Sequence, residues 1–168
     1  MKKLGVKFCL GLLVGCVFFS ASNTRASNMT ETVQGLSPCP NSPNCVCSDE
    51  PIDSKQYITP IVSANTELNG EEASDNSRGQ QLLVAIADYL QNRDEFQIIV
   101  QTENALKVEA RTSLLRFVDD IDMQVRGERV YVRSASRVGF FDFGKNRSRL
   151  EELRTQMVED GMAQPLSK

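Results

Sequence analysis

The spacing of hydrophobic residues changes once along the chain, from a helical period to a period of two. Between about Gln80 and Asn92 the apolar positions recur at helical spacing, which predicts an amphipathic helix. From Phe96 onward apolar and polar residues alternate, which predicts strands with one buried face. The acidic stretch Asn65 to Gly79 has neither period and is rich in Asn and Ser, so it predicts a loop.

The alternation is regular enough to predict how the strands pair. A short connection at Glu103 to Ala105 keeps the apolar rows of the first two strands together, and a two-residue turn at Gly127 and Glu128 joins the last two. The apolar rows are Phe96, Ile98, Val100 and Thr102; Leu106, Val108, Ala110 and Thr112; and Leu115, Phe117, Ile121, Met123 and Val125. The predicted opposed pairs are Val125 with Val130, Met123 with Val132, Phe117 with Val138, Asp122 with Arg133, Ile121 with Ser134 and Asp119 with Ser136.

In this register Asp119 lies in the core-facing row, where a carboxylate needs partners. A final helix is predicted to run to about Glu159, with Asp142 or a neighbour as its cap. Arg147 or Arg149 in its first turn can reach Asp119. Cations in the first turn oppose the helix dipole, so these arginines are better explained by pairing with an anion than by stabilising the helix. The predicted polar cluster comprises Asp119, Ser134, Ser136 and Asn146.

Together these elements predict a single α+β domain over residues 38–160. It contains a helix, a four-stranded antiparallel meander and a C-terminal helix packed on one face of the sheet. Before the first helix, Tyr57 to Ser63 surrounds Pro60 and predicts an edge strand or an extended segment, because proline removes a ladder donor. Residues 161–168 are expected to be a tail.

The N-terminal residues predict export. Three lysines in residues 1–7 precede an apolar run from Phe8 to Phe19, so residues 1–26 are interpreted as a signal segment. Within the run, residues 13–16 fit a bacterial lipobox, which predicts a lipid on Cys16 and membrane attachment. The alternative is ordinary cleavage after Ala26, where small residues precede the cut. Residues 27–37 would then be a flexible tether, and the protein would lie in the bacterial envelope, either periplasmic or lipid-anchored.

Three cysteines, Cys39, Cys45 and Cys47, follow the export segment, and an oxidising compartment suits them. Prolines and turn-forming residues between Cys39 and Cys45 bend the chain, so a short-loop disulfide is plausible and would leave Cys47 over. A metal site built from all three thiolates is the alternative. Such sites usually have four ligands, and the chain has no histidine, so we expect no metal and no cofactor.

Positive charge concentrates where the last strand meets the final helix. From Arg129 to Arg149 there are five arginines and one lysine against the single acid Asp142, in a chain whose net charge is -3. One interpretation is an external anion site at a helix N-terminus, and the other is internal pairing, as for Asp122 with Arg133. The candidate anion-binding residues are Arg137, Lys145, Arg147 and Arg149.

These residues limit the classes of function. Without histidine there is no Ser-His-Asp or Cys-His arrangement, and the absence of Trp and of aromatic interleaving argues against nucleic acid. We therefore expect a non-catalytic binding or accessory module that engages an anionic lipid, a glycan or an envelope protein. One alternative is a hydrolase or transferase of envelope components that uses Asp119 and Ser136. Another is a purely structural interaction module.

Three separate motifs stand out along the chain. They are Pro38-Cys39-Pro40 with Ser42-Pro43-Asn44-Cys45-Val46, Arg116-Phe117-Val118-Asp119-Asp120, and Arg133-Ser134-Ala135-Ser136-Arg137 with Asp142-Phe143-Gly144 and Asn146-Arg147. These motifs resemble those of one known family, the domain-of-unknown-function family DUF1499. They occur in the family's order and cover most of residues 38–154. The resemblance implies that Cys39 and Cys45 are the family's cysteine pair and that Cys47 is an additional thiol, since the family usually has serine there. It implies no activity, substrate or cofactor.

Overall fold

The structure is a computed structural model that describes residues 35–64, 67–68, 71–72, 74–112 and 117–166. The predicted signal segment, the lipidation candidate Cys16, most of the predicted tether and the predicted core residue Leu115 lie outside the described residues. Leu36 is already buried, and its N–H donates to the carboxylate of Asp49 at 2.9 Å. Among the described helices, none is long and apolar enough to cross a membrane.

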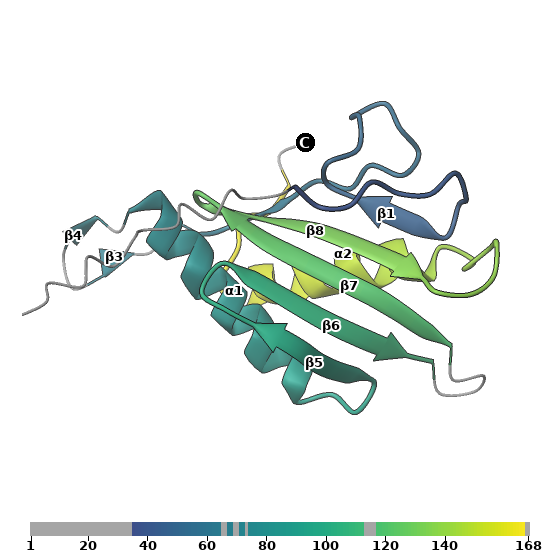
Figure 1. Cartoon of the computed structure of the whole chain (residues 1–168). Helices are drawn as coiled ribbons and strands as arrows, with labels where there is room; N and C mark the ends of the chain where they lie inside the picture. The colour runs from purple at the N-terminus through teal and green to yellow at the C-terminus, as the bar shows by residue number, and fades with distance from the viewer. Residues whose placement is uncertain (1–34, 65–66, 69–70, 73, 113–116, 167–168) are drawn as a thin grey trace, which may run out of the picture. The chain divides into compact units, whose positions relative to one another are not determined.

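The fold is α+β, with two helices on a six-stranded antiparallel sheet. The helices are α1 (Asp75–Gln91) and α2 (Lys145–Glu159), and Figure 1 shows both on the same face of the sheet. The sheet strands are β1 (Cys45–Cys47), β2 (Ile61–Val62), β5 (Phe96–Gln101), β6 (Ala105–Arg111), β7 (Val118–Arg126) and β8 (Arg129–Ser136). The order is β1-β8-β7-β6-β5, and β2 also pairs with β8. Two further strands, β3 (Glu67–Leu68) and β4 (Glu71–Glu72), pair only with each other.

The predicted meander and most of its register are confirmed. Strand β7 pairs with β8 so that Met123 opposes Val132 and Asp119 opposes Ser136, across a turn in which Gly127 has a φ of 62°. The predicted pair of Phe117 with Val138 is wrong, because β7 begins at Val118 and β8 ends at Ser136.

Two other boundaries differ from the prediction. Helix α1 begins five residues earlier than expected, because Ser74 caps it by accepting the N–H of Ser77 at 3.3 Å. In β5 a bulge between Ile98 and Val100 places Val100 opposite Lys107, so Val100 is exposed rather than in the core row.

The core lies between the helices and one face of the sheet. Its residues come from every layer: Leu82, Ile86 and Leu90 of α1, Leu150, Leu153 and Met157 of α2, and Leu106, Val108, Ile121, Met123, Val130 and Val132 of the sheet. The other face carries charged side chains, including those of Lys107, Glu109, Asp120, Asp122, Arg133 and Arg137. This alternation between a covered apolar face and an open charged face is what the period of two predicted.

Candidate functional site

A buried polar cluster joins α2 to the sheet, with Asn146 at its centre. The Nδ2 atom of Asn146 donates to the carbonyl of Asn44 and to the hydroxyl of Ser136, each at 3.0 Å. Its Oδ1 atom accepts from the hydroxyl of Ser134 and from the guanidinium of Arg149. Asn146 is completely buried, so an amide with all these partners fixes the position of α2 against β8 and β1.

Asp119 and Arg149 form a buried ion pair in this cluster. Arg149 Nη2 lies 2.9 Å from Asp119 Oδ2, and the two side chains are 8% and 4% exposed. The structure therefore brings the predicted polar residues Asp119, Ser134, Ser136 and Asn146 together, with Arg149 as the partner of the carboxylate. Sequence reasoning missed Asn44, although it stands inside the first quoted motif.

Backbone N–H groups at the start of α2 already have a partner in the chain itself. The carboxylate of Asp142 accepts the N–H of Gly144 at 3.0 Å and that of Asn146 at 2.8 Å. The helix begins after Gly144, whose φ of 76° is a left-handed conformation that favours glycine. The chain thus supplies its own carboxylate where an external anion was expected.

The four predicted anion-binding residues do not converge on one position. Arg137 lies on the outer face of the sheet and donates to Asp120 and Glu109 at 2.7 and 2.6 Å. These bonds raise the pKa of Arg137 and lower the pKa of Glu109. Because Arg149 pairs with Asp119 on the inner face, the sheet separates the two arginines.

The other two candidates also differ from each other. Arg147 donates to the backbone carbonyls of Lys55 and Tyr57, both at 2.8 Å. Lys145 is exposed, and within the described part of the chain it makes no ion pair. The arginine-rich segment is therefore largely used for internal contacts, and Lys145 is the one candidate of the four left for a ligand.

Asp122 and Arg133 face each other on the outer face of the sheet. Arg133 Nη1 lies 3.5 Å from Asp122 Oδ2, and Lys107 Nζ lies 3.8 Å from the other carboxylate oxygen. The side chains of Arg133 and Asp122 are 14% and 27% exposed, so the contact is only partly screened by water. This arrangement favours the internal-pairing interpretation of Arg133.

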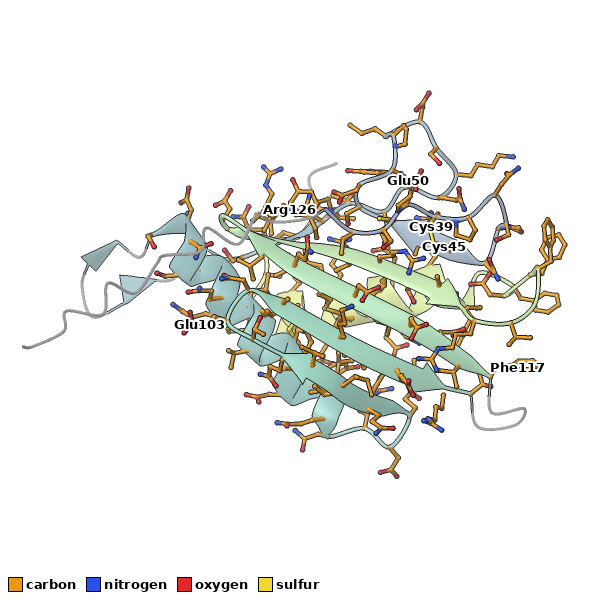
Figure 2. All side chains as sticks on the ribbon, viewed as in Figure 1. Cys39, Cys45, Glu50, Glu103, Phe117 and Arg126 are labelled. Carbon is orange, nitrogen blue, oxygen red and sulfur yellow. A yellow bond between two sulfur atoms is a disulfide. The ribbon has the colours of Figure 1, made fainter. Side chains whose placement is uncertain are left out.

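Next to Asp119 the surface contains a pocket of about 310 Å³. It lies between the ends of β7 and β8 and the loop that leads to α2. Its apolar lining comes from Phe117, Val138, Phe141 and Phe143, and its polar lining from Thr112, Asp119, Ser136, Asp142 and Lys145, with Gly139 completing the wall. Figure 2 shows Phe117 at one end of the sheet and Arg126 at the other.

The loop between β8 and α2 exposes large apolar side chains. Phe140, Phe141 and Phe143 are 60%, 65% and 98% exposed, and Val138 is 65% exposed. Isolated apolar residues are common on surfaces, but a contiguous group indicates a contact site. Sequence reasoning missed these phenylalanines; the signal was three of them within four residues, directly after a strand.

The structure joins Cys39 and Cys45 in a disulfide, which closes the loop that precedes β1 (Figure 2). The bond occupies two of the three thiolates that the metal alternative requires. Cys47 is a free, buried thiol whose pKa is raised, chiefly by burial. Among the described residues no group of three His, Cys, Asp or Glu side chains could hold a metal ion.

The geometry around Asp119 and Ser136 does not resemble an activated nucleophile. Asp119 is held by Arg149, and the hydroxyl of Ser136 accepts a hydrogen bond from Asn146. No hydrogen bond links Asp119 to Ser136 in the described structure. A serine nucleophile is activated by a base that accepts its proton, and the described structure shows no such hydrogen bond from Ser136.

Comparison with known protein families gives a match over most of the chain. The model of the family described as "Protein of unknown function (DUF1499)" matches residues 35–157. No curated protein and no solved structure gives a significant match. The matched range contains the disulfide, the buried polar cluster and the pocket beside Asp119. The chain therefore belongs to the DUF1499 family.

Proposed function

We propose that this protein is a non-catalytic binding module of the bacterial envelope. Its ligand is an amphiphile with an apolar chain and an anionic head, and its site is the pocket beside Asp119. The observation that carries the proposal is the composition of this pocket, where four large apolar side chains lie beside five polar ones. Ligand sites generally have this composition, and about 310 Å³ lies at the small end of their range.

The head group is inferred from the charges that remain after internal pairing. Asp119 is neutralised by Arg149, and the carboxylate of Asp142 is occupied by two N–H groups of the α2 start. Among the described lining residues, Lys145 is the only cation. An ammonium group without an internal partner attracts a carboxylate or phosphate, so an anionic head completes the site.

The apolar chain of the proposed ligand is inferred from the exposed aromatic side chains of the pocket. Phe141 and Phe143 line the pocket and are 65% and 98% exposed, so a ligand chain can cover surface that water now reaches. Covering such surface contributes about 25 cal/mol per Å². The proposal keeps the expectation of an anionic ligand but moves the contact from the arginines to Lys145 and the phenylalanines.

The hydrolase alternative has less support. The pocket does contain both Asp119 and Ser136. However, the carboxylate of Asp119 is engaged by Arg149, and the hydroxyl of Ser136 accepts a hydrogen bond from Asn146. A purely structural role, in turn, does not explain why the phenylalanine side chains are exposed.

Octanoate is a suitable probe, and octanol is its uncharged counterpart. Isothermal titration should show that octanoate binds and that Lys145→Gln weakens it roughly two- to fivefold, as expected for a partly exposed ion pair. Phe141→Ser should weaken both ligands by about tenfold or more. Lys55→Gln is the matched control, because Lys55 is an exposed lysine outside the pocket lining. Equal loss in Lys145→Gln and Lys55→Gln, or no binding of either ligand, would contradict the proposal.

A further inference from the structure

The pocket does not account for the whole apolar surface at this corner of the molecule. We define the phenylalanine loop as residues 138–144, between β8 and α2. Phe140 is 60% exposed but does not line the pocket, so a ligand bound there leaves it uncovered. A larger apolar partner is needed to cover Phe140 together with Phe143.

We propose that the phenylalanine loop inserts into the surface of a lipid bilayer. Phe140, Phe141 and Phe143 would enter the boundary between head groups and acyl chains, and Lys145 beside them would face lipid phosphates. Exposed phenylalanines next to a cation are the combination that interfacial membrane segments use.

The loop is held in the conformation that displays these side chains. Asn44 donates from its Nδ2 atom to the carbonyl of Gly139, and Asp142 accepts N–H groups from Gly144 and Asn146. Asn44 is itself fixed by its position beside the disulfide and by its contact with Asn146. The aromatic side chains are therefore presented by an anchored backbone.

The backbone conformation of Phe143 supports a functional role for the exposed side chains of this loop. Its φ of 55° is in the left-handed region, which is unfavourable for a residue with a Cβ, and it is the one non-glycine residue with positive φ in the described chain. Its side chain is 98% exposed, so no packing of the described residues compensates for the conformation. Backbone strain of this kind concentrates at functional positions.

A membrane is the partner that the sequence itself favours. The predicted lipid on Cys16 would place residue 35, the first described residue, only 19 positions from a bilayer anchor. Such a link gives the domain a high effective concentration at the membrane, so a modest affinity of the loop is sufficient. Figure 1 shows the loop projecting beyond the end of β8 before the chain enters α2.

The chain has no tryptophan, so one substitution introduces a unique reporter. Phe140→Trp in the full chain is reconstituted with vesicles of phosphatidylethanolamine and phosphatidylglycerol, with or without brominated acyl chains. Its emission should shift to the blue, and bromine near the head-group end of the chains should quench it. Ile52→Trp is the matched control, since Ile52 is 82% exposed and lies in another loop, and it should behave as in water.

The outcomes separate this inference from the proposed pocket. Phe143→Ser in the Phe140→Trp background should reduce the quenching, whereas Phe140→Ser should leave octanoate binding unchanged. A reporter at position 140 that stays water-like, or that shifts to the blue without quenching because a protein covers it, overturns membrane insertion. In both cases intact octanoate binding would leave the proposed function standing. If Phe140→Trp does not fold, Phe143→Trp provides the same measurement.

Discussion

Replacing Arg149 should be the most destabilising change in the arginine-rich segment. In Arg149→Leu the carboxylate of Asp119 loses its guanidinium partner at 2.9 Å, and Asn146 Oδ1 loses a donor at 3.2 Å. The side chain of Asp119 is only 4% exposed, so water compensates poorly for the lost contact. Breaking a buried pair in this way costs about 3–5 kcal/mol of unfolding free energy.

Two variants test whether the uncompensated charge is the cause. The double variant Asp119→Leu/Arg149→Leu removes both charges, and it should be more stable than Arg149→Leu alone, because an apolar replacement of a buried pair is often nearly neutral. Arg137→Leu is the matched control, since Arg137 also pairs with carboxylates but is 46% exposed on the open face. Its loss of stability should be a small fraction of that of Arg149→Leu.

Urea unfolding followed by circular dichroism measures all three variants. With an m-value of about 1–3 kcal/mol per M, the loss in Arg149→Leu corresponds to a fall of at least about 1 M in the midpoint. Equal midpoints for Arg137→Leu and Arg149→Leu would refute the assignment of one to the surface and the other to the core. A double variant no more stable than Arg149→Leu would refute the role of the buried charge.

Three further predictions concern other parts of the fold. Gly79→Ala should lower stability by about 1–3 kcal/mol in urea unfolding, although alanine favours helices, because its Cβ would collide with the backbone of the β7–β8 turn. Arg126 lowers the pKa of Asp49, so the ionised carboxylate stabilises the fold above about pH 4, and this contribution is lost as the pH falls through the folded pKa. The wild type should therefore lose more stability than Asp49→Asn between about pH 5 and pH 3, as measured by urea midpoints. Burial raises the pKa of Cys47, so iodoacetamide should label it slowly in the folded protein and rapidly in urea, as mass spectrometry would show.

The register of the sheet could be predicted because one face is buried and the other is not. A shift by one residue would expose the entire apolar row of β7, so the alternation itself fixes the pairing with β8. The bulge in β5 could not be predicted, because Ile98, Ile99 and Val100 are all apolar, so the alternation does not indicate which of them face the core. Strand β1 is only three residues long, which is too short for any period to show.

The positions of the arginines were harder to predict than the register. Charge counted along the sequence suggested one basic corner, but the partners of Arg137 come from β6 and β7. Asp119 and Asp120 are adjacent and therefore point to opposite faces, so their partners Arg149 and Arg137 must also be separated. The phenylalanine loop was missed because no period links it to a strand or a helix.

The position of the exposed phenylalanine loop depends on the buried polar cluster, and a pair of substitutions tests this. Asn146→Ala removes an amide that makes four hydrogen bonds, so it should lower stability and also weaken octanoate binding, because the start of α2 loses its position. Phe143→Ser alters a side chain that is 98% exposed, so it should keep the urea midpoint and weaken binding alone. If Phe143→Ser lowered the midpoint as much as Asn146→Ala, the loop would be part of the scaffold rather than the surface that the scaffold presents.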